Sequence, residues 1–169
     1  MLEWLPKIAA LEPAPARALD VAMGRGRHAL ALAAAGFRTF GVELKFEAVR
    51  DAIREASARS LTLHAWCADL NVYPLPSRVF DLVLVTRYLQ RDLFESLAGA
   101  IVPGGAVIYE TFTVNQRALG TGPTSPDHLL EVGELYERFR DFDVLFYEEV
   151  RTPEAVARIV ARKRPSCGT

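Results

Sequence analysis

The sequence predicts an α/β protein built on one mostly parallel sheet, and three observations carry that prediction. Residues 17–43 read as a strand, a glycine turn, a helix and a second strand that ends on an acid. Strand and helix patterns then alternate to the end of the chain, which is typical of parallel α/β sheets. The last two strand segments are too close in sequence for a parallel crossover, so they must pair as an antiparallel hairpin. We therefore expect a seven-stranded sheet with helices on both faces and a C-terminal antiparallel hairpin, in a single domain over residues 1–169.

The first strand and the turn after it predict a nucleoside ligand. Residues 18–22 form a short apolar run, and Gly24 and Gly26 let the backbone turn sharply and approach a ligand where a Cβ would collide. The turn opens into a helical pattern that Gly36 is well placed to end. Glu43 ends the second strand, where the acid of a βαβ unit accepts hydrogen bonds from ribose hydroxyls. The unit is Rossmann-like.

The other elements follow in order along the chain. We expect helices at residues 46–59, 91–100 and 132–140, and strands at residues 61–67, 80–85, 106–111, 142–149 and 155–162. Pro103-Gly104-Gly105 is expected to break the chain before the fifth strand. The last two strands are separated only by Arg151, Thr152 and Pro153, with Glu154 at the edge.

Two cofactor classes use such a unit. Residues 24–29 fit the dinucleotide pattern, with alanine in the third glycine position. Asp20, however, lies inside the first strand, where a nicotinamide-binding strand would continue apolar up to its first glycine. This acid and the turn in DVAMGRG resemble the first motif of class I S-adenosylmethionine-dependent methyltransferases, with Ala22 in the place of the family's first glycine. The resemblance implies a cofactor-binding region that includes Asp20, Ala22, Met23, Gly24, Gly26, Glu43 and Leu44.

Further segments resemble the same family. The resemblance implies that Asp69, at the end of the third strand, accepts a hydrogen bond from the adenine amino group while Leu70 presents its backbone nearby; the alternative is a turn aspartate before Asn71. VFDLVLVTRYL resembles the fourth motif and brings Thr86 to the carboxyl end of its strand, where ligands bind in open α/β sheets. The final antiparallel strand is also similar to the family's sheet. The run GRGRHALALAAAGF on so short a chain resembles the tellurite-resistance type of methyltransferase.

Candidates for the acceptor side lie at the carboxyl ends of the fourth and fifth strands and in the following loop: Arg87, Tyr88, Glu110, Thr111 and His128. The planar fork of Arg87 could hold an anionic acceptor, and the alternative is a surface ion pair with Asp92 or Glu95. Tyr88 could belong to the core with only its hydroxyl facing the pocket, and strand alternation does not settle which face Glu110 takes.

The loop at residues 117–128 is expected to be the substrate lid, because its glycines and prolines cannot continue either flanking element. Within it, His128 could act as a general base, since histidine titrates near neutral pH. The alternative is that His128 only begins the helical segment that follows. His28 and His64 are expected to be structural, and no metal site is expected.

The net charge and the cysteine content indicate which binding partners and which cellular compartment to expect. A net charge of −1 gives no electrostatic drive onto nucleic acid, and the basic residues Arg158, Arg162, Lys163 and Arg164 are expected on a solvated face. Cys67 and Cys167 suggest no disulfide framework and are expected to be reduced. No apolar run reaches the roughly 18 residues of a spanning helix, and no signal-peptide pattern occurs. We therefore expect a cytoplasmic protein with no membrane partner.

These observations predict an S-adenosylmethionine-dependent methyltransferase that acts on a small-molecule acceptor, since no inserted domain is left to recognise a macromolecule. Positioning would supply much of the rate. Two alternatives remain at this point: an NAD(P)-dependent oxidoreductase, and a non-catalytic S-adenosylmethionine-binding module. The sequence leaves the acceptor and the oligomeric state open.

Overall fold

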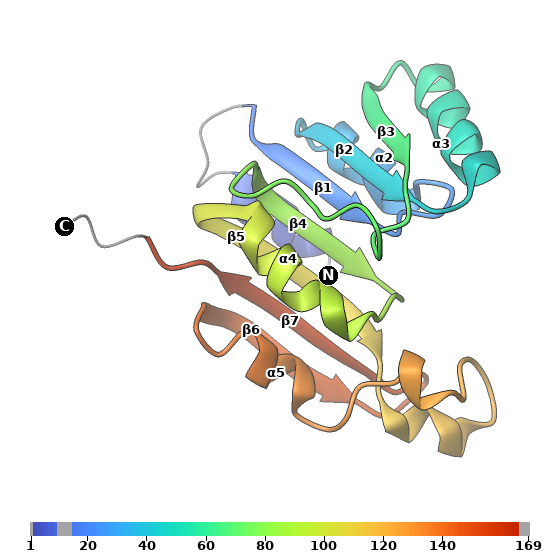
Figure 1. Cartoon of the computed structure of the whole chain (residues 1–169), viewed down its shortest axis with the longest axis vertical. Helices are drawn as coiled ribbons and strands as arrows, with labels where there is room; N and C mark the ends of the chain where they lie inside the picture. Colours follow the sequence, from blue (N-terminus) through green and yellow to red (C-terminus); the bar gives the residue numbers. More distant parts are fainter. Residues whose placement is uncertain (1, 10–14, 166–169) are drawn as a thin grey trace.

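The computed structural model describes residues 2–9 and 15–165, and its centre is a seven-stranded sheet in the order β3-β2-β1-β4-β5-β7-β6 (Figure 1). The strands are β1 (Arg17–Val21), β2 (Arg38–Glu43), β3 (Leu63–Cys67), β4 (Phe80–Thr86), β5 (Ile101–Phe112), β6 (Asp143–Val150) and β7 (Val156–Arg162). Strands β1 to β5 pair in parallel, whereas β7 is antiparallel to both β5 and β6. The predicted fold class and the C-terminal hairpin are confirmed.

Helices cover both faces of this sheet. They are α1 (Leu5–Ala9), α2 (Arg27–Ala34), α3 (Phe46–Ala58), α4 (Phe94–Ala100) and α5 (Glu134–Arg138), with 3-10 turns η1 (Leu2–Trp4), η2 (Arg91–Leu93), η3 (Val114–Leu119) and η4 (Pro126–His128). Apolar residues of α4 and α5 pack on one face and those of α1 and α2 on the other. Figure 1 shows α4 and α5 in front of the sheet and α2 behind it. The helix at Leu5–Ala9 was not predicted from the sequence.

The central strands form because their side chains are buried on both sides. Strand β4 reads FDLVLVT, a continuous apolar run of the kind that a sheet covered on both faces requires. Leu82 and Leu84 of this strand pack toward α1 and α2, whereas Val83 and Val85 pack toward α4 and α5. Because these strands are parallel, the carboxyl ends of β1, β2, β4 and β5 lie along one edge of the sheet. The clefts that contain the predicted site residues lie at this edge.

Strand β5 corrects one expectation. Pro103-Gly104-Gly105 does not break the chain before the strand; β5 begins at Ile101 and passes through these residues. Its register with β4 shifts between Phe80 and Leu82, which is how a strand accommodates extra residues as a bulge. A Cβ added at Gly105 would lie 2.8 Å from the Asp81 carbonyl oxygen, so glycine allows the two strands to approach.

The C-terminal basic residues are engaged within the fold. Arg158 pairs with Glu110 and Glu148, Arg164 pairs with Asp143, and Lys163 donates to the carbonyl oxygens of Ala98 and Ile101. They hold the hairpin against β5 and do not form a free basic patch. Cys67 is a free, exposed thiol, and Cys167 lies outside the described residues.

Candidate active site

The glycine turn after β1 is tightly built. Ala22 adopts a left-handed conformation with φ 52, and the Met23 amide donates to the Val42 carbonyl at 3.1 Å. Gly26 has φ 80 and begins α2, and a Cβ there would lie 2.8 Å from the Cβ of Ala52. A Cβ at Gly24 would meet no atom within 4 Å, so the space beside this residue is open to a ligand.

Glu43 links the turn to the end of β2. One carboxylate oxygen accepts from the Gly24 amide at 3.0 Å, and the other accepts from the Lys45 amide at 3.0 Å. An ionised carboxylate has about four lone-pair sites, so it can accept further hydrogen bonds from a ligand. Glu43 therefore fixes the turn and keeps acceptor capacity in the cleft beside it.

Asp20 lies in β1 beneath the turn and is 1% exposed. Among the described residues, neither of its carboxylate oxygens has a hydrogen-bond partner. Burial raises the pKa of Asp20 to about 7, and the nearby Ala29 amide and Arg27 charge offset only part of that effect. A buried carboxyl group without a hydrogen-bond partner is unfavourable, and a ligand, a water molecule or a proton would relieve this cost.

A cleft of about 290 Å³ runs from the turn along the ends of β2 and β3. We call it the cofactor cleft; the predicted residues that line it are Ala22, Glu43, Leu44, Asp69, Leu70, Arg87 and Tyr88. Asp69 also accepts from the amide and the side chain of Asn71, at 2.9 and 2.8 Å, so it caps a turn while it faces the cleft. Both interpretations of this aspartate are thus compatible with the geometry.

A second, more open cleft of about 410 Å³ lies on the other side of the turn. Met23, Gly24 and Thr86 line it, together with His28. His28, which was expected to be structural, has its Nδ1 2.8 Å from Thr86 Oγ1. Burial, followed by the charge of Arg27, lowers the pKa of His28. His64 stacks on Phe40, with ring centroids 5.1 Å apart.

Arg87 follows β4 in a left-handed conformation, with φ 56. The sequence-based alternative of an ion pair was right in kind but wrong in partner: both terminal nitrogens bind Glu154, not Asp92 or Glu95. The guanidinium also lies over the ring of Phe112, 4.7 Å from its centroid. Its fork is therefore engaged by the protein's own carboxylate.

Glu110 takes the sheet face that α1 and α2 cover, as its cross-strand partners show. It binds Arg158 at 2.5 Å, and Arg158 binds Glu148 at 2.8 Å. Glu110 lines none of the clefts described here. Thr111 is buried.

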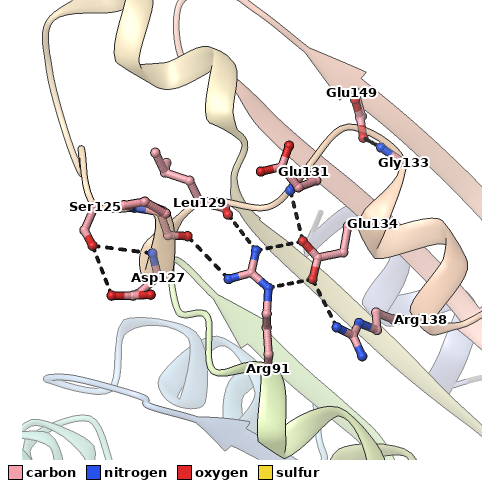
Figure 2. Close-up of polar contacts among 10 residues, drawn as sticks. Arg91, Ser125, Asp127, Leu129, Glu131, Gly133, Glu134, Arg138 and Glu149 are labelled. Carbon is pink, nitrogen blue, oxygen red and sulfur yellow. Dashed lines mark hydrogen bonds and ion pairs between the residues drawn. The ribbon is translucent and has the colours of Figure 1, made fainter.

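The lid loop, residues 117–128, is more ordered than its composition predicts. Buried Gln116, just before it, donates to the Thr121 carbonyl at 2.8 Å and accepts from the Ala155 amide at 2.7 Å. Arg91 donates to the carbonyls of Pro126 and Leu129, at 3.3 and 2.9 Å. Figure 2 shows the opposite side of the same guanidinium held by Glu134, with two contacts of 2.8 Å.

The lid loop contributes Pro123 and His128 to the wall of a third cavity, of about 310 Å³, that we call the lid cavity. Its walls are Arg87, Tyr88, Leu89, Phe112, Pro123 and His128. The structure thus brings three of the five predicted acceptor-side residues together and leaves Glu110 and Thr111 apart. Sequence reasoning missed Glu154, Phe112, Arg91 and Gln116, whose roles depend on contacts between distant segments.

The residues of the cofactor cleft fit S-adenosylmethionine. Glu43 offers acceptor oxygens for ribose hydroxyls, and the end of β3 offers Asp69 and Leu70 for a base. Asp20 does not line this cleft; it lies beneath the turn as a buried acid without a hydrogen-bond partner among the described residues. In residues 2–9 and 15–165, no group of three or more acidic, histidine or cysteine side chains could hold a metal ion. Nor does the described part of the chain contain a helix with the length and apolarity needed to span a bilayer.

Solved structures share this fold. TehB from Haemophilus influenzae is 17% identical with a TM-score of 0.76; the match covers 95% of this chain and 61% of TehB, so this chain spans about three fifths of that protein. The 4+2 cyclase SpnF is 18% identical with a TM-score of 0.77, over 98% of this chain and 81% of SpnF. An S-adenosylmethionine-dependent methyltransferase from Mesorhizobium loti is 20% identical with a TM-score of 0.72, over 96% and 98% of the two chains.

No curated protein matches the chain by sequence. Residues 18–105, just over half of the chain, match the family described as methyltransferase domain. This segment runs from β1 into β5 and contains the glycine turn, Glu43, Asp69 and the end of β4. The match excludes the nicotinamide-binding alternative as the family of this chain. The chain belongs to the methyltransferase-domain family, whose cofactor is S-adenosylmethionine.

Proposed function

We propose that this protein transfers the methyl group of S-adenosylmethionine to a small-molecule acceptor. The observation that carries the proposal is the arrangement of two cavities: the cofactor cleft and the lid cavity share Arg87 and Tyr88 as walls. A ligand in each would therefore meet at the carboxyl ends of β4 and β5. The lid cavity is of small-molecule size, since such sites usually measure about 300–1,000 Å³.

When bound, S-adenosylmethionine supplies an electrophilic methyl group on a sulfonium, which passes to a nucleophile of the acceptor and leaves S-adenosylhomocysteine. The chain's own contribution is to bind and orient the two partners. In this proposal Glu43 holds the ribose, and Asp69 and Leu70 hold the adenine. The methionine end is held by the turn from Ala22 to Gly26, which includes Met23, and by Asp20. Leu44 and Thr86 flank these contacts, and Arg87, Tyr88 and His128 face the acceptor. Glu110 is left with a structural ion pair.

The test is transfer of labelled methyl groups from S-adenosylmethionine into an extract of small metabolites. We expect a labelled product with the native protein and a strongly reduced yield with Glu43→Ala. Binding of S-adenosylhomocysteine without any labelled product would favour the second candidate, a non-catalytic binding module. The cyclase SpnF has this fold, so the fold alone does not fix the reaction.

We also propose a cytoplasmic location, which the exposed free thiol of Cys67 supports.

A further inference from the structure

The lid cavity has walls that are mostly apolar and aromatic. Phe112 from the end of β5, Tyr88 and Leu89 from the segment after β4, and Pro123 from the lid loop surround its volume of about 310 Å³. Binding sites for small molecules are typically lined in this way, with a few polar groups that fix orientation. His128 and Arg87 are the polar members of this wall.

The charge of the cavity is already balanced. Both terminal guanidinium nitrogens of Arg87 bind the Glu154 carboxylate, with the longer contact at 2.7 Å. The same guanidinium lies over the Phe112 ring, with its central carbon 4.7 Å from the ring centroid. An anionic ligand would therefore find no free cation in Arg87, and a cationic ligand would find no unpaired carboxylate among the cavity walls. Transfer of either ion out of water without a partner is unfavourable.

Hydrogen bonds from several elements hold the walls of the cavity in place. Arg117 donates to the Thr124 carbonyl at 3.0 Å, next to Pro123. Arg91 binds the carbonyls of Pro126 and Leu129, on either side of His128, while Glu134 holds Arg91 from behind (Figure 2). Tyr109 donates to the Tyr88 carbonyl at 2.9 Å and fixes the opposite wall. Such a preformed pocket selects by shape and polarity.

We propose that the lid cavity binds a neutral aromatic acceptor that carries a hydroxyl or amino group, with the ring between Phe112, Tyr88 and Pro123 and the polar hydrogen donated to His128. This inference rests on the proposed methyltransferase function and names its substrate class. Aromatic rings pack favourably on other rings, and the imidazole of His128 can accept the proton that such an acceptor loses when it is methylated. It replaces the anionic acceptor that the sequence alone suggested, because the fork of Arg87 is taken.

The test compares three probes of one ring size on the protein saturated with S-adenosylhomocysteine: phenol, anisole and benzoate. Dissociation constants come from NMR titration. We expect phenol to bind. The dissociation constant of benzoate should be at least about tenfold higher than that of phenol, because the carboxylate lacks a partner. Anisole should also bind more weakly, because it has no hydrogen to donate. Benzoate binding as tight as phenol would overturn the proposal, and so would anisole binding as tight as phenol.

Two variants sharpen the comparison. Glu154→Gln leaves the Arg87 charge unmatched, so benzoate should gain affinity relative to phenol; Glu95→Gln, on the exposed surface of α4, is the matched control. Phe112→Ala should weaken phenol about 3- to 10-fold through the lost ring contact, whereas Tyr73→Ala, at a 65% exposed ring, should not. An unchanged benzoate-to-phenol ratio in Glu154→Gln would contradict the charge argument.

The outcome can be separated from that of the proposed function. Binding of S-adenosylhomocysteine is measured first, without any probe. If it binds and phenol does not, the substrate class is wrong while the methyltransferase function stands. If it does not bind, the proposed function itself fails.

Discussion

At the scale of single residues, Glu43 has a structural role in the turn and, in the proposed function, a second role in binding the ribose. Its carboxylate accepts from the Gly24 and Lys45 amides and faces the cofactor cleft. We expect Glu43→Ala to weaken S-adenosylhomocysteine binding by roughly 1.5–3 kcal/mol, the usual loss for charge-assisted hydrogen bonds. Calorimetric titration measures this, with the exposed Glu47→Ala of α3 as the control. Equal affinity of the two variants would show that Glu43 holds only the turn.

Ala22 is strained where the family's glycine usually stands. Its φ of 52 is left-handed, a conformation that costs a residue with a Cβ roughly 1–2 kcal/mol. Glycine relieves this strain but loses more chain entropy, about 0.5–1 kcal/mol. Ala22→Gly should therefore keep cofactor affinity and leave the free energy of unfolding unchanged or raise it by up to about 1.5 kcal/mol. A marked loss of stability in a denaturant titration would be inconsistent with this backbone geometry.

Asp20 predicts a pH dependence of stability. Its pKa is raised to about 7 from 3.8 by burial, and its surroundings are the Ala29 amide, Arg27 and Glu43. The unfolded chain loses this proton near pH 4 and the folded chain only near pH 7, so stability falls across that interval and stays low above it. The full effect is bounded by about 4 kcal/mol.

The variant Asp20→Asn removes this titration. We expect its melting temperature, relative to that of the native protein, to increase from pH 5 to about pH 7 and to level off by pH 8. A difference that does not change with pH would mean that Asp20 is ionised in the folded protein throughout this range. Thermal unfolding of both proteins in one buffer series makes the measurement.

Sequence reasoning could predict that the proposed cofactor residues lie together, because they stand at the ends of strands. Glu43 ends β2 and Leu44 follows it, whereas Asp69 and Leu70 come shortly after β3, and parallel strands place their carboxyl ends together. It could not find Glu154, which lies 67 residues from Arg87. That contact exists only because β7 pairs with β5, so no local sequence pattern predicts it.

At the scale of elements, the lid loop depends on Arg91. Burial alone would raise the pKa of Glu134, but hydrogen bonds from Arg91 and the Glu131 amide outweigh it and lower that pKa. Arg91→Lys keeps the charge, but a lysine cannot bind Glu134 through two nitrogens and also bind the carbonyls of Pro126, in the lid loop, and Leu129, just after it. We expect a loss of roughly 1–3 kcal/mol in the free energy of unfolding and faster proteolysis within the lid loop.

The control for that variant is Arg138→Lys. Arg138 contacts the same Glu134, at 3.3 Å, but no lid carbonyl is bound to it among the described contacts. Its effect on lid proteolysis should be small. If both variants increase cleavage equally, the lid is held by the charge of Glu134 and not by the carbonyl contacts of Arg91.

The strands were easier to predict than the short helices α1 and α5. Strand β4 is a continuous apolar run, and such a run is typical of a strand that is buried on both faces of a sheet. Helix α1 has only five residues, and Leu5 and Ile8 become a helical pattern only against the sheet. Helix α5 is shorter than predicted because Gly133, with φ 81, delays its start to Glu134.

At the scale of the whole molecule, the strand order β3-β2-β1-β4-β5-β7-β6 brings the glycine turn, the ends of β2 and β3, and the lid loop to one edge (Figure 1). The alternation of patterns and the short final connection predicted the mostly parallel sheet and its antiparallel hairpin, but not the strand order. The acceptor side required the structure, since the lid cavity is assembled from β4, β5 and the loop after β5.

The central claim is that this edge binds S-adenosylmethionine, and calorimetric titration with S-adenosylhomocysteine and with NADH, under identical conditions, tests it most directly. We predict saturable binding of S-adenosylhomocysteine at one site per chain, abolished or strongly weakened in Glu43→Ala, and no binding of NADH. Binding of NADH without binding of S-adenosylhomocysteine would contradict the account.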